Sequence, residues 1–206
     1  VVGGGPVAAG QTSIPVASTA GFASGQEVLI IQMIGASAGD YAVRTLSGVT
    51  SGQLDVGVDL GGTNIKLGLV DSAGKVLARE LLPTRAKKGP KQALERVAEA
   101  AARLAAGRRL RSIGIGLPGL VDHVNGVVRL PPNLPKWNGA PIKHTLERLT
   151  GVPVFCANDV NAVTLGEWKF GAGRDCRDFI CVTLGTGLGG GIVAGGQLIL
   201  GANHAA

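Results

Sequence analysis

The sequence predicts an α/β fold with a mixed sheet, preceded by a short β-rich segment. Residues 54–206 alternate strand-like and helix-like stretches in the order β-β-β-α-β-α-β-α, which is typical of layered α/β folds. Two glycine-rich turns lie between predicted strands of this part. Residues 1–53 differ in composition, since Glu27, Asp40 and Arg44 are their only charged residues. This break predicts a domain boundary near residues 52–55.

The first segment, residues 1–53, is predicted to contain three strands separated by Gly, Ala and Ser, at Thr12–Ser18, Glu27–Ile34 and Tyr41–Val49. It contains no amphipathic basic helix, so a DNA-binding helix-turn-helix is not expected. The role of this appendage is open: a natural fusion and an artificial or misassembled junction fit the sequence equally well.

The second segment begins with three predicted strands, Leu54–Asp59, Ile65–Val70 and Val76–Leu82. A helix is predicted from Pro90 to Ala106, because proline is favoured in a first helical turn and the apolar residues that follow recur at helical spacing. Gly107 is expected to end this helix.

The remaining elements continue the alternation of strands and helices. They are the strand Ser112–Gly116, a long loop rich in Pro and Gly, the helix Ile142–Thr150 ended by Gly151, the strand Val152–Ala157, a helix at Asn161–Phe170, the strand Phe179–Leu184 and a hairpin around Gly195-Gly196.

The composition excludes several classes of protein. Hydrophobic residues make up 45% of the chain, yet no apolar run approaches the roughly 18 residues of a membrane-spanning helix. Cys156, Cys176 and Cys181 lack CxxC spacing, which favours free thiols in a reducing, cytoplasmic compartment. The net charge of +6 comes with few aromatic residues, which favours a solvated basic face over nucleic-acid binding.

The strongest local signal is Asp59-Leu60-Gly61-Gly62-Thr63-Asn64, between two predicted strands. Paired glycines let backbone N–H groups approach phosphate oxygens, because no Cβ blocks the way, and Thr63 and Asn64 add side-chain donors. Asp59 can hold Mg²⁺ through water. A plain Gly-Gly hairpin turn is the alternative interpretation.

A second glycine-rich turn, Leu184-Gly185-Thr186-Gly187-Leu188-Gly189-Gly190-Gly191, suggests another backbone cradle for phosphate in the same sheet. A dinucleotide fingerprint is not indicated, because a strand follows the turn, and the Gly-Lys-Ser/Thr ending of a P-loop is missing.

The third signal is Asn158-Asp159, which follows an apolar strand and precedes a helix. A carboxylate at this end of a strand lies where ligands bind in open α/β sheets, and it can accept a proton from an attacking hydroxyl. The competing interpretation is that Asp159 only caps the helix.

Together these signals resemble the ROK sugar kinases, a family of the actin/hexokinase superfamily with a ribonuclease H-like fold, and within it the glucokinases. The resemblance covers about residues 54–206. It rests on five ordered motifs: Asp59–Asn64, Gly116-Leu117-Pro118-Gly119, Pro132-Asn133-Leu134 with Trp137, Asn158-Asp159-Val160-Asn161-Ala162 and Leu184-Gly185-Thr186-Gly187.

The resemblance implies transfer of the γ-phosphoryl group of Mg·ATP to a hexose hydroxyl, with glucose as the expected hexose and glucose 6-phosphate as the product. It makes Asp159 the catalytic base and places Asn158, Asn133 and Gly119 around the sugar. The first phosphate loop would consist of Asp59, Gly61, Gly62, Thr63 and Asn64, with Lys66 adding positive charge nearby. Gly185, Thr186 and Gly187 would form the second.

The resemblance also has limits. The family's Gly-Glu-x-Gly-His motif, its structural zinc ligands and its second lobe would follow residue 206, so the chain is expected to be an incomplete N-terminal lobe and inactive alone. A complete form is expected to be a homodimer, with ATP and sugar as its partners. The alternative function is that of a sugar-sensing ROK regulator or a non-catalytic sugar-binding lobe, and ATP against polyphosphate as donor stays open.

Overall fold

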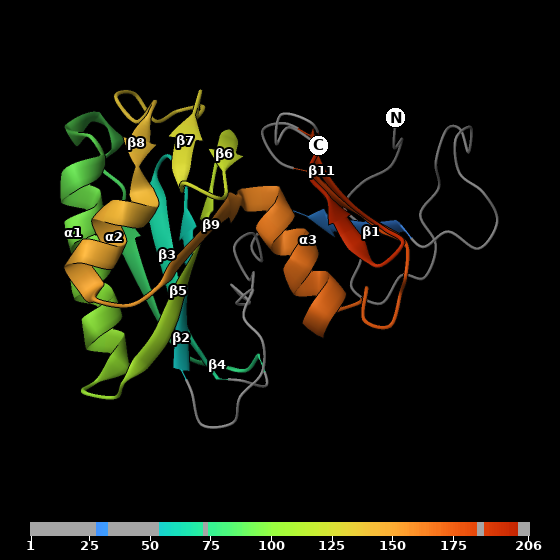
Figure 1. Cartoon of the computed structure of the whole chain (residues 1–206), viewed down its shortest axis with the longest axis horizontal. Coiled ribbons are helices and arrows are strands. Elements are labelled where there is room, and N and C mark those ends of the chain that lie inside the picture. The colour runs from blue at the N-terminus through green and yellow to red at the C-terminus, as the bar shows by residue number, and fades with distance from the viewer. Residues whose placement is uncertain (1–27, 33–53, 72–73, 185–187, 202–206) are drawn as a thin grey trace.

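The computed structural model describes residues 28–32, 54–71, 74–184 and 188–201. Within these residues the chain forms a mixed α/β structure with two larger sheets and one small one (Figure 1). The predicted α/β class is therefore confirmed. Of the three strands predicted in the first segment, only β1 (Val28–Gln32) falls inside the described residues. The other two, Thr12–Ser18 and Tyr41–Val49, lie outside them.

The central feature is a five-stranded sheet with the order β4-β3-β2-β5-β9. Its strands are β2 (Leu54–Leu60), β3 (Asn64–Asp71), β4 (Val76–Pro83), β5 (Leu110–Leu117) and β9 (Val154–Asn158). β2, β3 and β4 are antiparallel neighbours, whereas β2, β5 and β9 run parallel. Strands β2 and β5 carry apolar runs buried on both faces, as the inner strands of a covered parallel sheet require.

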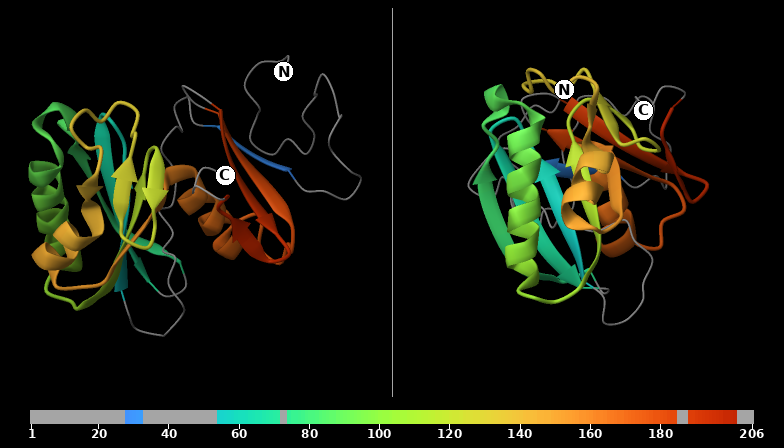
Figure 2. Two further views of the ribbon diagram at one scale, coloured as in Figure 1. Left: turned by 45° about the horizontal axis from the view of Figure 1, so that its top comes forward. Right: turned by 60° about the vertical axis from the view of Figure 1, so that its left-hand side comes forward.

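Two helices cover one face of this sheet, α1 (Pro90–Ala105) and α2 (Ile142–Thr150), and they pack against each other (Figures 1 and 2). Gly151 ends α2 in the left-handed conformation that glycine adopts at little cost, as predicted. α1 ends one residue earlier than predicted. Ala106, rather than Gly107, takes the left-handed position that follows its last turn.

The predicted Pro- and Gly-rich loop after β5 contains a small sheet that the sequence did not reveal. Its strands are β6 (Leu120–Asp122), β7 (Val127–Arg129) and β8 (Ala140–Pro141). Strands of two or three residues are too short to show an alternating pattern. Trp137 anchors the loop: its ring is fully buried in the core, and its Nε1 donates a hydrogen bond to the carbonyl of Ala86 at 3.2 Å.

The strand Phe179–Leu184, expected to belong to the one mixed sheet, instead starts a second sheet. This sheet has the order β1-β10-β11-β12 and comprises β10 (Phe179–Leu184), β11 (Leu188–Ala194) and β12 (Gln197–Ile199), with β1 parallel to β10. Helix α3 (Asp159–Phe170) lies between the two larger sheets (Figures 1 and 2). The two glycine-rich turns therefore belong to different sheets.

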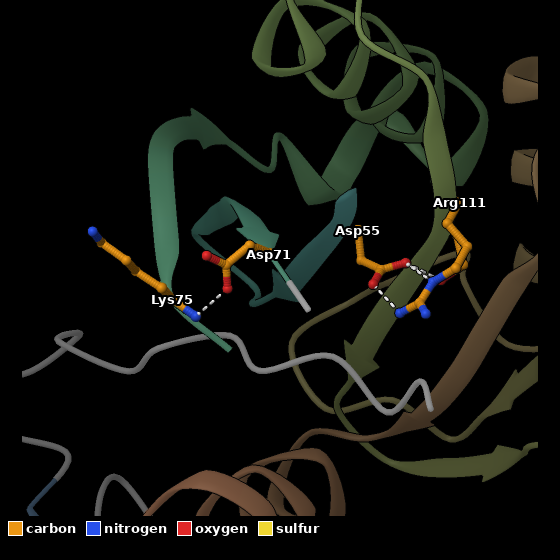
Figure 3. A network of polar contacts seen from close by, with 5 residues as sticks. Asp55, Asp71, Lys75 and Arg111 are labelled. Atoms are coloured by element: carbon orange, nitrogen blue, oxygen red, sulfur yellow. Dashed lines mark hydrogen bonds and ion pairs between the residues drawn. The ribbon is translucent and has the colours of Figure 1, made fainter. Parts of the chain in front are cut away.

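A buried ion pair joins β2 to β5 at their amino-terminal ends. The guanidinium of Arg111 contacts both carboxylate oxygens of Asp55 (Figure 3). The Ser112 hydroxyl donates to Asp55 Oδ1 at 2.6 Å. The Asp55 side chain is only 2% exposed. A buried carboxylate is tolerated when its lone pairs are satisfied in this way, so the cluster fixes how the two strands pair.

Replacing Asp55 with Ala is expected to lower the free energy of unfolding by about 3–5 kcal/mol, because Arg111 would stay partly buried without its partner. Urea denaturation measures this change. The control is Arg103→Gln, which removes the exposed Arg103–Glu80 pair and should leave the unfolding midpoint almost unchanged. Equal effects of the two variants would contradict the role assigned to the buried cluster.

Candidate active site

The predicted site residues gather at one edge of the five-stranded sheet, where its parallel strands end. Asp59 of β2 is paired with Gly116 of β5, and Leu117 of β5 with Asn158 of β9. The chain then turns directly into α3, whose first residue is Asp159. The sheet thus brings together residues that lie about 100 positions apart in the sequence.

Asn158, rather than Asp159, caps helix α3. Its Oδ1 accepts hydrogen bonds from the backbone N–H of Val160 at 3.0 Å and of Asn161 at 3.2 Å. Its Nδ2 donates to the carbonyl of Gly119 at 3.1 Å. Asp159 therefore stands one position inside the helix, so the interpretation of Asp159 as only a cap is wrong. Asn158 also ties the helix start to the loop that carries Gly119.

Gly116 permits the close approach of α3 to the sheet, a role that the sequence analysis did not assign. A Cβ at this position would lie 3.4 Å from Asp159 Cα and 3.6 Å from Ala162 Cβ. A larger side chain would push the helix start away from β5. The signal was present in the sequence as a glycine at the end of a buried strand, where close backbone approach is one of the common explanations.

The environment of Asp159 favours its protonated form. Burial is the main cause that raises the pKa of its carboxyl group, and the nearby charge of Asp59 adds to this, while the hydrogen bond from the Val160 N–H opposes it. Such a carboxylate has a greater affinity for a proton than an exposed one, which suits a general base.

The first glycine-rich loop, Gly61–Asn64, joins β2 to β3 at the end of β2 that carries Asp59. The Gly61 N–H donates to the Asn64 carbonyl at 3.0 Å. Lys66 forms an ion pair with Asp59 at 3.4 Å, with both side chains about one third exposed, so its ammonium group lies at the end of β2 next to the loop.

Asn133 and Gly119 come from the loop that contains β6–β8. A Cβ on Gly62 would lie 3.0 Å from Asn133 Cβ, so the phosphate-loop candidate and the sugar-site candidate touch. Gly119 has a φ of 89°, and a Cβ there would lie 2.7 Å from Pro131 Cα. Only glycine fits this position without strain. The structure thus brings Asp59, Gly62, Gly119, Asn133, Asn158 and Asp159 into one region.

Gly185, Thr186 and Gly187 of the second predicted phosphate loop lie outside the described residues. Their flanking residues are described: Leu184 pairs with Leu188 as β10 and β11 form an antiparallel ladder. A Cβ on Gly189 would lie 2.8 Å from Val160 Cγ2, so β11 begins against the first turn of α3.

Among the described residues, no group of three or more His, Cys, Asp or Glu side chains could hold a metal ion such as zinc. The cysteines there are free, and burial raises the pKa of the Cys156 thiol to about 12, as expected for a small core residue. No helix in the described ranges is long and apolar enough to cross a membrane.

Comparison with known proteins decides the family. The ROK family matches residues 55–206, which is most of the chain. This chain belongs to the ROK family. It is 43% identical over 146 residues to the glucokinase of Thermotoga maritima, a match that covers 71% of this chain and 46% of that protein. The chain therefore spans about half the length of the curated relatives it matches.

Solved structures of the family agree with this fold. The ROK glucokinase of Streptomyces griseus, solved in complex with glucose and AMPPNP, has a TM-score of 0.68 and 39% identity, covering 74% of this chain and 48% of its own. A ROK family transcriptional regulator reaches a TM-score of 0.66 at 28% identity, covering 74% of this chain and 39% of its own. The expected actin/hexokinase-like fold is confirmed, and both kinases and regulators share it.

The raised pKa of Asp159 predicts a pH-dependent stability difference. Because the folded state binds this proton more tightly than the unfolded chain, Asp159 reduces stability as pH rises above the ordinary Asp value of about 3.9. Asp159→Asn is therefore expected to be more stable than the natural protein at pH 7, with the difference vanishing near pH 3.

Urea denaturation at both pH values measures this difference. Asp175→Asn is the control, since the Asp175 side chain is 91% exposed and should show no such dependence. A difference of the same size at both pH values would contradict the role of the Asp159 charge.

Proposed function

We propose that this chain is the sugar- and phosphate-binding half of a ROK sugar kinase that transfers the γ-phosphoryl group of ATP to a hexose hydroxyl, converting glucose to glucose 6-phosphate. The observation that carries the proposal is that Asp159 lies half-buried at the start of α3, directly after Asn158 and close enough to Asp59 for the two carboxylates to interact. The identity of 43% to a glucokinase supports glucose as the substrate.

In this proposal Asp159 accepts the proton of the attacking sugar hydroxyl. Asn158, Asn133 and the backbone of Gly119 surround the sugar and orient that hydroxyl toward the donor. The contact between Asn158 and Gly119 supports this, because it holds the two sides of the sugar pocket at a fixed separation. Positioning of this kind is the main source of rate enhancement in phosphoryl transfer.

The Gly61–Asn64 loop would bind the phosphates of ATP through backbone N–H groups and the side chains of Thr63 and Asn64, both of which are exposed. Lys66 would add positive charge, and Gly185, Thr186 and Gly187 would form the second phosphate loop. The residues fit a magnesium ion, because Asp59 offers a partly exposed carboxylate beside the loop. Asp59 would hold the ion through water, and the ion would neutralise charge on the phosphates.

A sugar-sensing regulator is the second candidate, since a ROK regulator shares the fold. The buried environment of Asp159 favours the kinase, because a sensor has no need of a base with a raised pKa. For the complete protein we propose a cytoplasmic homodimer with sugar and ATP as partners and no role for nucleic acid. Its structural zinc ligands would lie outside this chain, and residues 1–53 would be an appendage whose role is open.

The direct test measures glucose-dependent formation of ADP by this chain and by a chimera in which the Thermotoga maritima glucokinase supplies the remaining half. The chimera is expected to phosphorylate glucose, whereas the chain alone should bind sugar weakly and turn over little, since kinases of this type close two lobes over their substrates. A folded chimera that binds glucose without turnover would favour the sensor function.

Asp159→Asn in the active chimera is expected to lower kcat about 10²–10⁴-fold, because the general base is lost. Glucose affinity should change only a few-fold, since the amide can keep the hydrogen bond from the Val160 N–H. Steady-state kinetics and glucose titration measure both quantities, with Asp175→Asn as the control. Turnover within a few-fold of the parent would refute the base assignment.

Gly62→Ala is expected to weaken Mg·ATP binding about tenfold, because its Cβ would crowd Asn133 and displace the loop, and overpacking costs about 1–3 kcal/mol. Gly68→Ala in β3 is the matched control, since its Cβ would meet its nearest neighbour at an ordinary 3.6 Å. Calorimetric titration with Mg·ATP compares the two. Equal affinities would refute the assignment of the first phosphate loop.

A further inference from the structure

We propose that Thr84 is a positioning residue for the first phosphate loop and that Arg96 holds Thr84 in place. This inference rests on the proposed function of the Gly61–Asn64 loop and adds two residues that the family motifs in the sequence do not contain. Thr84 follows β4, and Arg96 lies on the second turn of α1.

The side-chain hydroxyl and the backbone N–H of Thr84 both donate hydrogen bonds to the loop. Its Oγ1 donates a hydrogen bond to the Gly61 carbonyl at 2.6 Å, and its backbone N–H donates to the Thr63 carbonyl at 2.7 Å. The side chain is fully buried, with 0% exposed. A single residue therefore takes up two of the carbonyl groups in the four-residue loop.

These two hydrogen bonds determine where the loop directs its donors. In a planar trans peptide the C=O and the following N–H point in opposite directions, and the described residues contain no cis peptide. Because the Gly61 carbonyl points at Thr84, the Gly62 N–H points away from it. The Thr63 carbonyl fixes the direction of the Asn64 N–H in the same way.

The loop has donors to offer. In the part of the chain that the structure describes, two successive N–H groups donate to no protein acceptor: that of Gly62, whose direction Thr84 fixes through the Gly61 carbonyl, and that of Thr63 next to it. Successive N–H groups of this kind form a concave site for anions. Thr84 thus holds the carbonyl side of the loop and leaves the N–H side for phosphate oxygens.

Arg96 holds the backbone of Thr84 in place through hydrogen bonds to carbonyl groups. Its two terminal nitrogens donate to the carbonyls of Pro83 at 2.5 Å and of Thr84 at 2.8 Å, and its Nε donates to the Gln92 carbonyl within α1 at 3.3 Å. A guanidinium can serve both carbonyls at once, whereas a lysine ammonium has no such planar fork. A chain of hydrogen bonds therefore connects α1 to the loop through Arg96 and Thr84, so the place of the loop depends on the place of the helix.

The test substitutes Thr84 by Val and by Ser in the full chain labelled with ¹⁵N. Val keeps the branched shape and the backbone N–H but lacks the hydroxyl, whereas Ser keeps the hydroxyl. Titration with Mg·ATP is followed through the amide signals of Gly61 and Gly62. We expect Thr84→Val to bind about fivefold to tenfold more weakly, the effect of one hydrogen bond, and Thr84→Ser to bind within about twofold of the natural chain.

Amide hydrogen exchange without nucleotide gives a second readout: the Gly61 amide, which donates to the Asn64 carbonyl, should exchange faster in Thr84→Val. Thr150→Val is the matched control: it removes a similar hydrogen bond, to the Leu146 carbonyl at 2.7 Å, at the end of α2. It should change neither readout. Arg96→Lys, which leaves Thr84 intact, is expected to show the same changes as Thr84→Val but smaller.

The outcomes separate the two proposals. If the natural chain shows Mg·ATP-dependent shifts at Gly61 and Gly62, and both Thr84→Val and Arg96→Lys show the same affinity and exchange, the positioning role is overturned while the loop assignment stands. If the natural chain shows no such shifts at millimolar nucleotide, the loop assignment fails and this inference fails with it. Weakened binding in Thr84→Val that Thr84→Ser restores supports both.

Discussion

The close approach of helix α3 to strand β5 is the contact on which the candidate site depends. It exists because Gly116 has no side chain, so that the Asp159 backbone comes within van der Waals distance of the sheet. This approach places a carboxylate at the end of the parallel strands and partly removes it from water. The same burial raises the pKa of Asp159 and opposes folding at neutral pH. A proton acceptor suited to catalysis and a small loss of stability therefore have one physical origin.

Glycines also allow a close approach on the side of α3 that faces β11. A Cβ on Gly191 would lie 2.0 Å from Thr164 Oγ1, and Gly189 meets Val160 in a similar way. The glycines after the second predicted phosphate loop thus allow β11 to pack directly on the helix, whereas their number in the sequence had suggested only a cradle for phosphate. Since α3 contacts both larger sheets, a shift of β11 relative to the helix would act on the turn that carries Asp159.

How much could be predicted from the sequence depended on how local the signal was. Helix α2 was predicted with its correct ends, because Gly151 gives a local stop signal, and β10 was predicted because its apolar run is continuous. The sheet to which β10 belongs was predicted wrongly, since strand partners are set by distant contacts. Asn158 and Asp159 are both favoured helix caps, so sequence preference alone could not distinguish them. Thr84 carries no motif at all. Its role appears only when the end of β4 lies beside the loop.

The ion pair at the far end of the sheet explains how the site residues meet at the near end. Asp55 is paired with Ser112, and four residues along the same two strands Asp59 is paired with Gly116. In a β-ladder a slip of one residue turns every side chain to the opposite face. A slip that paired Asp55 with Ile113 would move the Asp55 carboxylate away from Arg111 and would also place Leu117 where Gly116 must admit α3. The same register therefore places Arg111 beside the buried carboxylate of Asp55 at one end of β2. At the other end it places Gly116 where helix α3, which begins with Asp159, comes close to the sheet. Stability and site geometry are in this way fixed by one pairing of two strands.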